Sequence, residues 1–200
     1  MLEKTIKAKA DMVGFVHFAK SPRHLELEAI NKILAQAKTR IKSVVLLVNP
    51  NDELLEKVAL LQPDYIQLHG NESFERITEI KQKYNIAIIK ALAIASIADL
   101  EQVAHYNKIA EMIILDAKTP KNSANPGGMG KVFDWDILKS LANDIKFMLS
   151  GGLDINNVSV AVSSVRPYGL DVSSGVEIER GKKDAKMISQ FIKKAREAAK

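Results

Sequence analysis

Residues 148–158 read Met-Leu-Ser-Gly-Gly-Leu-Asp-Ile-Asn-Asn-Val, an apolar run that passes through Ser-Gly-Gly into a helix-like pattern. Glycine has no Cβ, so it adopts positive φ easily and lets the backbone approach a ligand closely. A helix that follows such a turn directs its free N–H groups back toward it, which favours an anion there. This stretch therefore predicts a strand, an anion site at Gly151 and Gly152, and then a helix.

A second junction of the same kind follows at residues 168–177, which read Tyr-Gly-Leu-Asp-Val-Ser-Ser-Gly-Val-Glu. Two consecutive strand-to-turn junctions late in a βα-repeating chain are typical of the phosphate site of a (β/α)₈ TIM barrel. The alternative is two ordinary βα turns that carry glycine and serine. We expect Ser173 and Ser174 to join Gly151 and Gly152 in binding phosphate.

The rest of the chain alternates between apolar runs and helical patterns. We expect strands at 12–18, 43–48, 64–70, 86–91, 112–116, 145–149 and 168–172, and helices at 2–10, 26–39, 52–61, 72–83, 97–107, 133–142, 154–164 and 182–198. Nearly every strand is apolar along its whole length, as in parallel strands covered by helices. The sequence therefore predicts one α/β domain over residues 1–200, a TIM barrel with seven visible strands and its first strand missing.

The composition narrows the class of protein. A length of 200 residues suits a single domain, and no apolar run approaches the length of a membrane span. The N-terminus does not resemble a signal peptide, and the absence of cysteine excludes disulfides and thiolate chemistry, so we expect a cytoplasmic protein. The net charge of +5 is spread along helical patterns, which suits an anionic small substrate better than nucleic acid.

Polar side chains stand at or just after the ends of most predicted strands. In a barrel of parallel strands these positions converge on the C-terminal rim, where active sites are built. Any one of them could instead be an ordinary turn-forming residue. The converging set consists of Arg23, Gln67, His69, Lys90, Asp116, the turn at Gly151 and Gly152, Asp171, Ser173 and Ser174. A long polar loop at 117–131 is also of a length that is usually functional or disordered.

Several motifs, in order along nearly the whole chain, resemble those of the phosphoribosylanthranilate isomerases. They are Gly14-Phe15-Val16 with Ser21-Pro22-Arg23, Gln67-Leu68-His69-Gly70, Leu115-Asp116-Ala117-Lys118, Gly127-Gly128-Met129-Gly130-Lys131 with Phe133-Asp134-Trp135, Leu149-Ser150-Gly151-Gly152-Leu153, and Asp171-Val172-Ser173-Ser174-Gly175-Val176-Glu177. The resemblance implies a (β/α)₈ barrel that catalyses an Amadori rearrangement in tryptophan biosynthesis. It implies neither a metal nor an organic cofactor.

The resemblance also implies roles for individual residues. Asp116 would be the general acid that protonates the ribose ring oxygen, and Arg23 would pair with the anthranilate carboxylate. The phosphate would lie on the two glycine- and serine-bearing turns. Gln67, His69 and Asp171 would face the substrate, although a structural role is favoured for His69. The loop 117–131, with Gly127 and Gly128 as hinges, would fold over the sugar.

The chain departs from the family at its beginning. The family starts with a strand of the type Lys-Ile-Cys-Gly, whose cysteine is the general base, whereas this chain begins inside the first helix and contains no cysteine. We therefore expect impaired isomerase activity. The open explanations are a shortened chain, a barrel closed by another segment or a second copy, or a barrel remnant that binds a phosphosugar without turnover. His17 is a conceivable replacement base, although a half-buried strand histidine is commoner.

Other barrel enzymes fit less well. A pentose-phosphate epimerase would need a set of metal-ligating histidines, which the strand ends do not offer. An indole-glycerol-phosphate synthase would not pair Asp116 with the Gly-Gly-Met-Gly loop. We expect a phosphorylated small molecule as the partner, with neither nucleic acid nor membrane, and a monomer or homodimer as the assembly.

Overall fold

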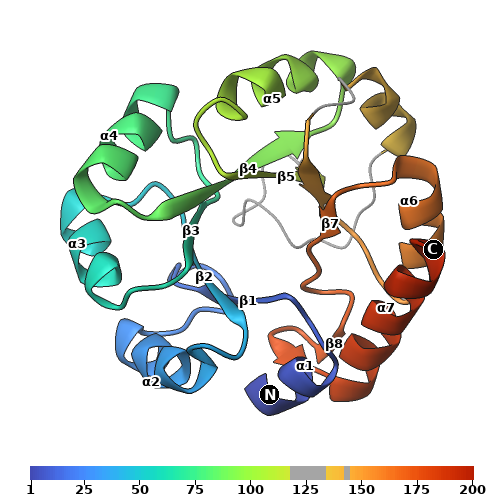
Figure 1. Cartoon of the computed structure of the whole chain (residues 1–200), viewed down its shortest axis with the longest axis horizontal. Coiled ribbons are helices and arrows are strands. Elements are labelled where there is room, and N and C mark those ends of the chain that lie inside the picture. The colour runs from blue at the N-terminus through green and yellow to red at the C-terminus, as the bar shows by residue number, and fades with distance from the viewer. Residues whose placement is uncertain (118–133, 142–144) are drawn as a thin grey trace.

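The computed structural model describes residues 1–117, 134–141 and 145–200. The described part contains one curved sheet of seven parallel strands, which pair in chain order. These strands are β1 (Met12–Val16), β2 (Lys42–Leu47), β3 (Tyr65–Leu68), β4 (Ala87–Ile94), β5 (Met112–Ala117), β6 (Phe147–Leu149) and β7 (Gly169–Leu170). The sheet curls around a central axis with the helices outside it (Figure 1). The predicted barrel-type α/β fold with seven visible strands is confirmed.

The helices between the strands are α1 (Leu2–Lys7), α2 (Leu27–Ala37), α3 (Asp52–Leu60), α4 (Phe74–Tyr84), η1 (Ile97–Leu100), α5 (Glu101–Tyr106), η2 (Trp135–Ser140), α6 (Val158–Val165) and α7 (Ala185–Ala198). Three of the α-helices follow N-cap residues whose side chains accept a backbone N–H of the first turn, namely Asn51, Ser73 and Asp184. Such caps satisfy donors that a helix cannot pair internally. None of the helices in the described part has both the length and the apolar character that a membrane crossing requires.

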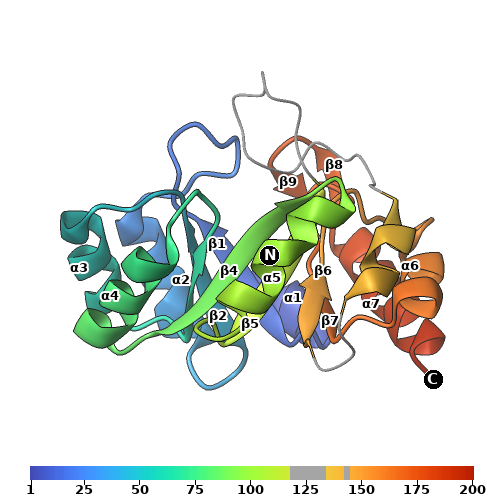
Figure 2. The same ribbon diagram turned by 90° about the horizontal axis from the view of Figure 1, so that it is seen from above.

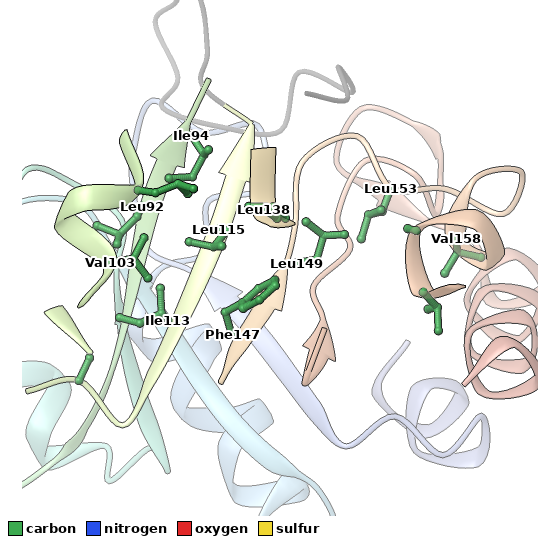
Figure 3. Packing of buried hydrophobic residues seen from close by; sticks show 14 of the residues in the cluster. Leu92, Ile94, Val103, Ile113, Leu115, Leu138, Phe147, Leu149, Leu153 and Val158 are labelled. Carbon is green, nitrogen blue, oxygen red and sulfur yellow. The ribbon is translucent and has the colours of Figure 1, made fainter. Parts of the chain in front are cut away.

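The apolar core lies in two layers. Between the sheet and the helices, one cluster covers the first half of the chain and another the second half, where Leu115 and Leu149 meet Val158 and Leu138 (Figure 3). A smaller cluster, which includes Ile114, contains strand residues only, so it fills the inside of the curve. Alternate side chains of a strand point to opposite faces. Strands buried on both faces are therefore apolar throughout, as the sequence indicates.

The first and last strands in chain order, β1 and β7, are the edges of this sheet among the described residues. At the outer layer, α1 packs against α7, and Figure 1 shows α1 between α2 and α7. The Arg196 guanidinium donates a hydrogen bond of 2.6 Å to the carbonyl of Lys9. The segment before β1 is thus attached to the last helix.

Several predicted boundaries are wrong. The final helix begins at Ala185, because Lys182–Lys183 forms strand β9, which pairs antiparallel with β8 (Glu177–Glu179). The helix expected from residue 154 begins at Val158, because Asp154 and Asn157 form a hydrogen-bonded turn before it. The expected helices at 97–107 and 133–142 contain the 3₁₀ segments η1 and η2.

Two further differences concern the predicted rim of the barrel. Strand β4 runs on to Ile94, so Lys90 lies in the middle of that strand and not at its end. Of the predicted strand 168–172, only Gly169–Leu170 forms a strand in the structure. The polar loop 117–131, with its expected hinges Gly127 and Gly128, lies outside the described residues except for Ala117, which ends β5.

Candidate active site

The carboxyl ends of the strands surround a pocket. The predicted site residues that line it are Arg23, His69, Asp116, Gly151, Gly152, Asp171, Ser173 and Ser174. Figure 2 shows the β1–α2 loop and the β8–β9 hairpin on the same side of the sheet. Gln67 does not line the pocket, and Lys90 does not either. Most of the set expected from strand ends is therefore brought together at one place.

Two carboxyl groups stand in this pocket. Asp116 is the penultimate residue of β5 and is buried, and Asp171 directly follows β7. The hydroxyl of Ser150 donates to Oδ2 of Asp171 over 3.1 Å. Burial, and then the negative charge of Asp116, raise the pKa of Asp171 above its usual range. The pocket therefore favours a proton on one of its carboxyl groups.

His69 stands next to this pair, with Nε2 3.4 Å from Oδ2 of Asp116. On the other side of the ring, the amide nitrogen of Gln67 lies 3.0 Å from Nδ1 of His69. An amide nitrogen only donates, so Nδ1 accepts and the neutral ring carries its proton on Nε2. The buried Gln67 therefore lies behind His69 and holds the ring so that the Nε2–H of His69 faces Asp116.

The turn at Gly151 and Gly152 has φ angles of 84° and 69°, in the left-handed region that favours glycine. Asn157 donates from its side chain to the carbonyl of Gly152 over 2.8 Å, which fixes the exit of the turn. The first turn of α6 comes only after Asn157, so this helix begins later than the expected residue 154 and does not directly follow the glycines. The backbone of the turn itself is what faces the pocket.

The two glycine-bearing turns contact each other. Asp154 forms an isolated bridge with Gly175, and a Cβ on Gly175 would lie 1.8 Å from the carbonyl oxygen of Leu153. Only glycine allows this approach. Ser173 and Ser174, which precede Gly175, therefore lie on the same pocket as Gly151 and Gly152.

Replacing Gly151 by alanine is expected to lower both stability and ligand binding. The added Cβ would lie 2.3 Å from the backbone nitrogen of Ala117 and 2.9 Å from Oδ1 of Asp116. The positive φ adds a strain of ~1–3 kcal/mol for a residue with a side chain. Urea unfolding and phosphate-ligand titration of Gly151→Ala measure the two effects. Gly14→Ala is the control, because a Cβ added at Gly14 would have no other atom within 4 Å; equal losses in both variants would contradict the argument.

A partly buried charge cluster, which the sequence does not reveal, joins the loop after β1 to the β8–β9 hairpin. Arg23 donates through Nε and Nη2 to the two carboxylate oxygens of Glu177, both at 2.7 Å. Lys183 donates to Oε1 of Glu177 at 2.8 Å and to the hydroxyl and carbonyl of Ser173 at 2.9 and 2.7 Å. Arg23 therefore reaches the pocket while it is held by Glu177.

The sequence offers only part of the signal for this cluster. Glu177 closes the quoted motif that carries Ser173 and Ser174, but its partner 154 residues away cannot be deduced from that motif. Lys183 falls inside a segment expected to be helical, where a lysine indicates a solvated face. The pairing of β9 with β8 instead brings the Lys183 ammonium into contact with Ser173.

The Glu177 carboxylate predicts a loss of stability in acid. Burial alone would raise its pKa, but hydrogen bonds from Arg23 and Lys183 outweigh this and lower the pKa from 4.5 to about 2. A lowered folded-state pKa gives stability that is complete above about pH 4.5 and is lost as the pH falls toward about 2. Urea unfolding at pH 6 and pH 3 should show a smaller decrease for Glu177→Gln than for the parent chain. Exposed Glu179, changed to Gln, is the control and should keep the parent's dependence on pH.

His17 does not take part in this pocket. Its neighbours Val16 and Phe18 line the pocket, whereas His17 lines a second cavity beside α2 and α3. The alternation of side chains along an extended segment explains the difference. The idea that His17 replaces the missing base is therefore not supported by its position.

The fold and the pocket together define a class. A curled parallel βα sheet, with a pocket at the carboxyl ends of its strands that is lined by two contacting glycine turns and two carboxyl groups, is the arrangement of a (β/α)-barrel enzyme.

Within that class, the chain belongs to the N-(5'-phosphoribosyl)anthranilate (PRA) isomerase family, whose family model matches residues 1–194. The chain is 46% identical over 198 residues to the N-(5'-phosphoribosyl)anthranilate isomerase of Bradyrhizobium sp. (strain ORS 278), covering 98% of this chain and 90% of the relative. The family resemblance read from the motifs is thereby confirmed.

Solved structures of phosphoribosyl anthranilate isomerases have the same fold as this chain. The crystal structure of phosphoribosyl anthranilate isomerase from Thermotoga maritima is 35% identical, with a TM-score of 0.87, and the match covers 98% of this chain and 93% of that one. Another crystal structure, of phosphoribosyl anthranilate isomerase in complex with reduced 1-(o-carboxyphenylamino)-1-deoxyribulose 5-phosphate, is 32% identical with a TM-score of 0.84, and the match covers 98% of this chain and 92% of that one.

Proposed function

We propose that this chain is an N-(5'-phosphoribosyl)anthranilate isomerase of L-tryptophan biosynthesis, which converts an aldose amine to a ketose amine by an Amadori rearrangement. The observation that carries the proposal is the position of the Asp116 carboxyl. It is buried in the same pocket as the two contacting glycine turns, in a chain that matches this family over nearly its whole length. Residues 1–200 act as one domain in this proposal.

The substrate carries an anion at each end, and the pocket offers a site for each. The phosphate lies on the turns that carry Gly151, Gly152, Ser173 and Ser174, which line the pocket, and it is held mainly by backbone N–H groups of these turns. Arg23 binds the anthranilate carboxylate, because a planar guanidinium matches a carboxylate. Its existing bond to Glu177 holds the guanidinium in place before the substrate arrives.

The sugar between these anchors faces Asp116. Asp116 donates a proton to the ribose ring oxygen, the bond from that oxygen to C1 breaks, and the anilino nitrogen forms a Schiff base with C1. The raised pKa of Asp171 favours retention of a proton within the carboxyl pair when substrate binds. His69, oriented by Gln67, holds Asp116 through its Nε2–H, while Asp171 contacts the substrate near its amino group or ribose.

The second half of the reaction removes the proton from C2, after which the enol amine rearranges to the ketose. In the family this is the task of a cysteine on a preceding strand, and this chain contains no cysteine. A barrel that binds the phosphosugar without turnover is the alternative function, which the family match over residues 1–194 and the named relatives do not favour.

One experiment separates the two functions. Turnover is followed by the loss of substrate fluorescence, for the 200-residue chain and for a version extended at its N-terminus by a Lys-Ile-Cys-Gly strand. We expect the extended version to turn over faster, since it regains a general base. A matched Lys-Ile-Ser-Gly extension restores the strand without the thiol and should not. Ligand-dependent thermal stabilisation with no turnover in a folded Cys-bearing version would favour the binder.

Other properties of the chain stay predictions. A crystal structure is known of mutually generated monomers of the dimeric phosphoribosylanthranilate isomerase from Thermotoga maritima, so a monomer and a homodimer both suit this family. A cytoplasmic location and a reaction without metal or organic cofactor are expected from the composition and the family chemistry.

A further inference from the structure

A cluster outside the active site has the composition of a metal site. His17 follows β1, and His24 and Glu26 precede α2 on the same loop. One ligand atom from each of the three side chains lies within 4.8 Å of those of the other two. In a tetrahedral zinc site, bonds of about 2.0–2.2 Å place the ligand atoms roughly 3.3 Å apart. Small side-chain rotations would therefore bring these three to a shared cation.

His17 is already oriented as a ligand. Its Nδ1 lies 2.9 Å from the carbonyl oxygen of Leu25, so Nδ1 donates its proton there and Nε2 keeps its lone pair. Histidines that bind metals commonly donate their other N–H to a carbonyl or carboxylate in this way. The backbone is also fixed, because the N–H of His17 donates to the carbonyl of Leu46 on β2.

The ring of His24 packs against that of His17, but one of its two nitrogens has no hydrogen-bond partner in the part of the chain that the structure describes. The two rings lie 4.9 Å apart, and the backbone of His24 bridges Val16 of β1. Nε2 of His24 is 3.0 Å from Oε1 of Glu26, whereas its buried Nδ1 has no hydrogen-bond partner among the described residues. A buried nitrogen of this kind calls for an explanation. Binding of a cation by this ring would use the lone pair that the protein leaves unmatched.

The charge around the cluster also suits a cation. The cavity beside it is lined by His17 and by three carboxylates, those of Glu26, Glu28 and Glu53. The one lysine of that lining, Lys57, is paired with Glu53 at 2.6 Å. The local charge is thus negative, which attracts a divalent ion and repels an anionic substrate.

We propose that His17, His24 and Glu26 bind a divalent transition-metal ion, with Zn²⁺ as the best fit. Two imidazoles and a carboxylate are ligands that zinc accepts, and water completes the tetrahedron. The ion does not take part in the isomerisation, because His17 lies on the cavity beside α2 and α3 and not on the active-site pocket. It cross-links the β1–α2 loop, whose other residues Ser21 and Arg23 reach that pocket.

The test uses the 200-residue chain, freed of metal with a chelator. Titration with Zn²⁺ should show one strong site, and Co²⁺ at the same site should give the intense visible absorption of a four-coordinate ion. His17→Asn and His24→Asn should each weaken Zn²⁺ binding at least about 10-fold, a loss typical of altered metal sites. His105→Asn is the matched control, because His105 is an exposed histidine of α5, and it should bind Zn²⁺ as the parent does.

Glu26→Gln provides a variant that leaves the core untouched, since Glu26 is exposed. It should weaken Zn²⁺ binding while the melting temperature without metal stays that of the parent. Zn²⁺ should also raise the melting temperature of the parent more than that of any of the three variants, because only the folded chain holds the site. Equal Zn²⁺ affinity in the parent and in all three variants would overturn the proposal, and none of these readouts depends on turnover.

Discussion

Replacing Asp116 by asparagine should lower the isomerase rate by about 10²–10⁴-fold, the usual worth of a positioned general acid. Asparagine keeps the shape of the side chain and can still meet the Nε2–H of His69, but it has no acidic proton to give to the ribose ring oxygen. The comparison is made in the version of the chain that turns over, by following the fluorescence of phosphoribosylanthranilate. Substrate affinity should change much less than kcat, because the phosphate and carboxylate anchors remain.

The matched variant is Gln67→Glu, which places a carboxylate behind His69 instead of the donor amide. An acceptor at that position favours a proton on Nδ1, so the neutral ring no longer presents an Nε2–H to Asp116. We expect it to lower kcat by less than Asp116→Asn does, because the acid itself remains. A kcat for Asp116→Asn within about threefold of the parent would mean that another group supplies the proton, contrary to general acid catalysis by this residue.

The barrel-type fold could be predicted from the sequence because each of its determinants is local. The strand runs at Val44–Leu47 and Ile113–Leu115 are apolar on both faces, which only a covered parallel strand requires. The glycines at 151 and 152 are also a local signal, since glycine adopts a positive φ easily and both have it in the structure. Strand ends then converge because parallel strands share one rim, so a linear pattern indicates the three-dimensional pocket.

What the sequence could not show are contacts between charges that lie far apart along the chain. The bond between Arg23 and Glu177 spans 154 residues, and the position of Lys183 depends on the antiparallel pairing of β8 with β9. In that hairpin β8 is the three residues Glu-Ile-Glu and β9 is only Lys182–Lys183, so the strands are too short and too polar for an apolar alternation to stand out. A lysine within such a stretch is indistinguishable from one on a solvated helix.

The position of Lys90, inside a strand, is another feature that could not be predicted from the sequence. The sequence predicts that it ends its strand at the rim, yet β4 continues past it and its side chain turns inward, 2% exposed, to the equally buried Glu72. Its ammonium lies 2.7 Å from Oε2 of Glu72 and 2.6 Å from the carbonyl of Gly70. Burial lowers the pKa of Lys90, and the charge of Glu72 opposes that effect. The pair secures the loop after β3 to β4.

Replacing Lys90 by methionine should therefore destabilise the chain by about 3–5 kcal/mol, the usual cost of removing one partner of a buried ion pair. Methionine fills a similar volume but leaves the Glu72 carboxylate without its cation in a site that water does not reach. Glu72 cannot simply turn away, because its Oε1 also accepts the N–H groups of Asn49 and Gly70, at 2.8 and 3.1 Å. Urea unfolding followed by circular dichroism measures the loss.

The double variant Lys90→Met with Glu72→Gln decides between a charge effect and a packing effect. Glutamine keeps an oxygen for the N–H groups of Asn49 and Gly70 and removes the unpaired charge, so the double variant should be more stable than Lys90→Met alone. The exposed pair of Lys57 and Glu53, at 2.6 Å, is the comparison, because breaking a surface pair should cost at most about 1 kcal/mol. If Lys90→Met and Lys57→Met cost the same, the buried pair would have no special part in holding the loop after β3, and the stability of the rim would have to come from the apolar clusters alone.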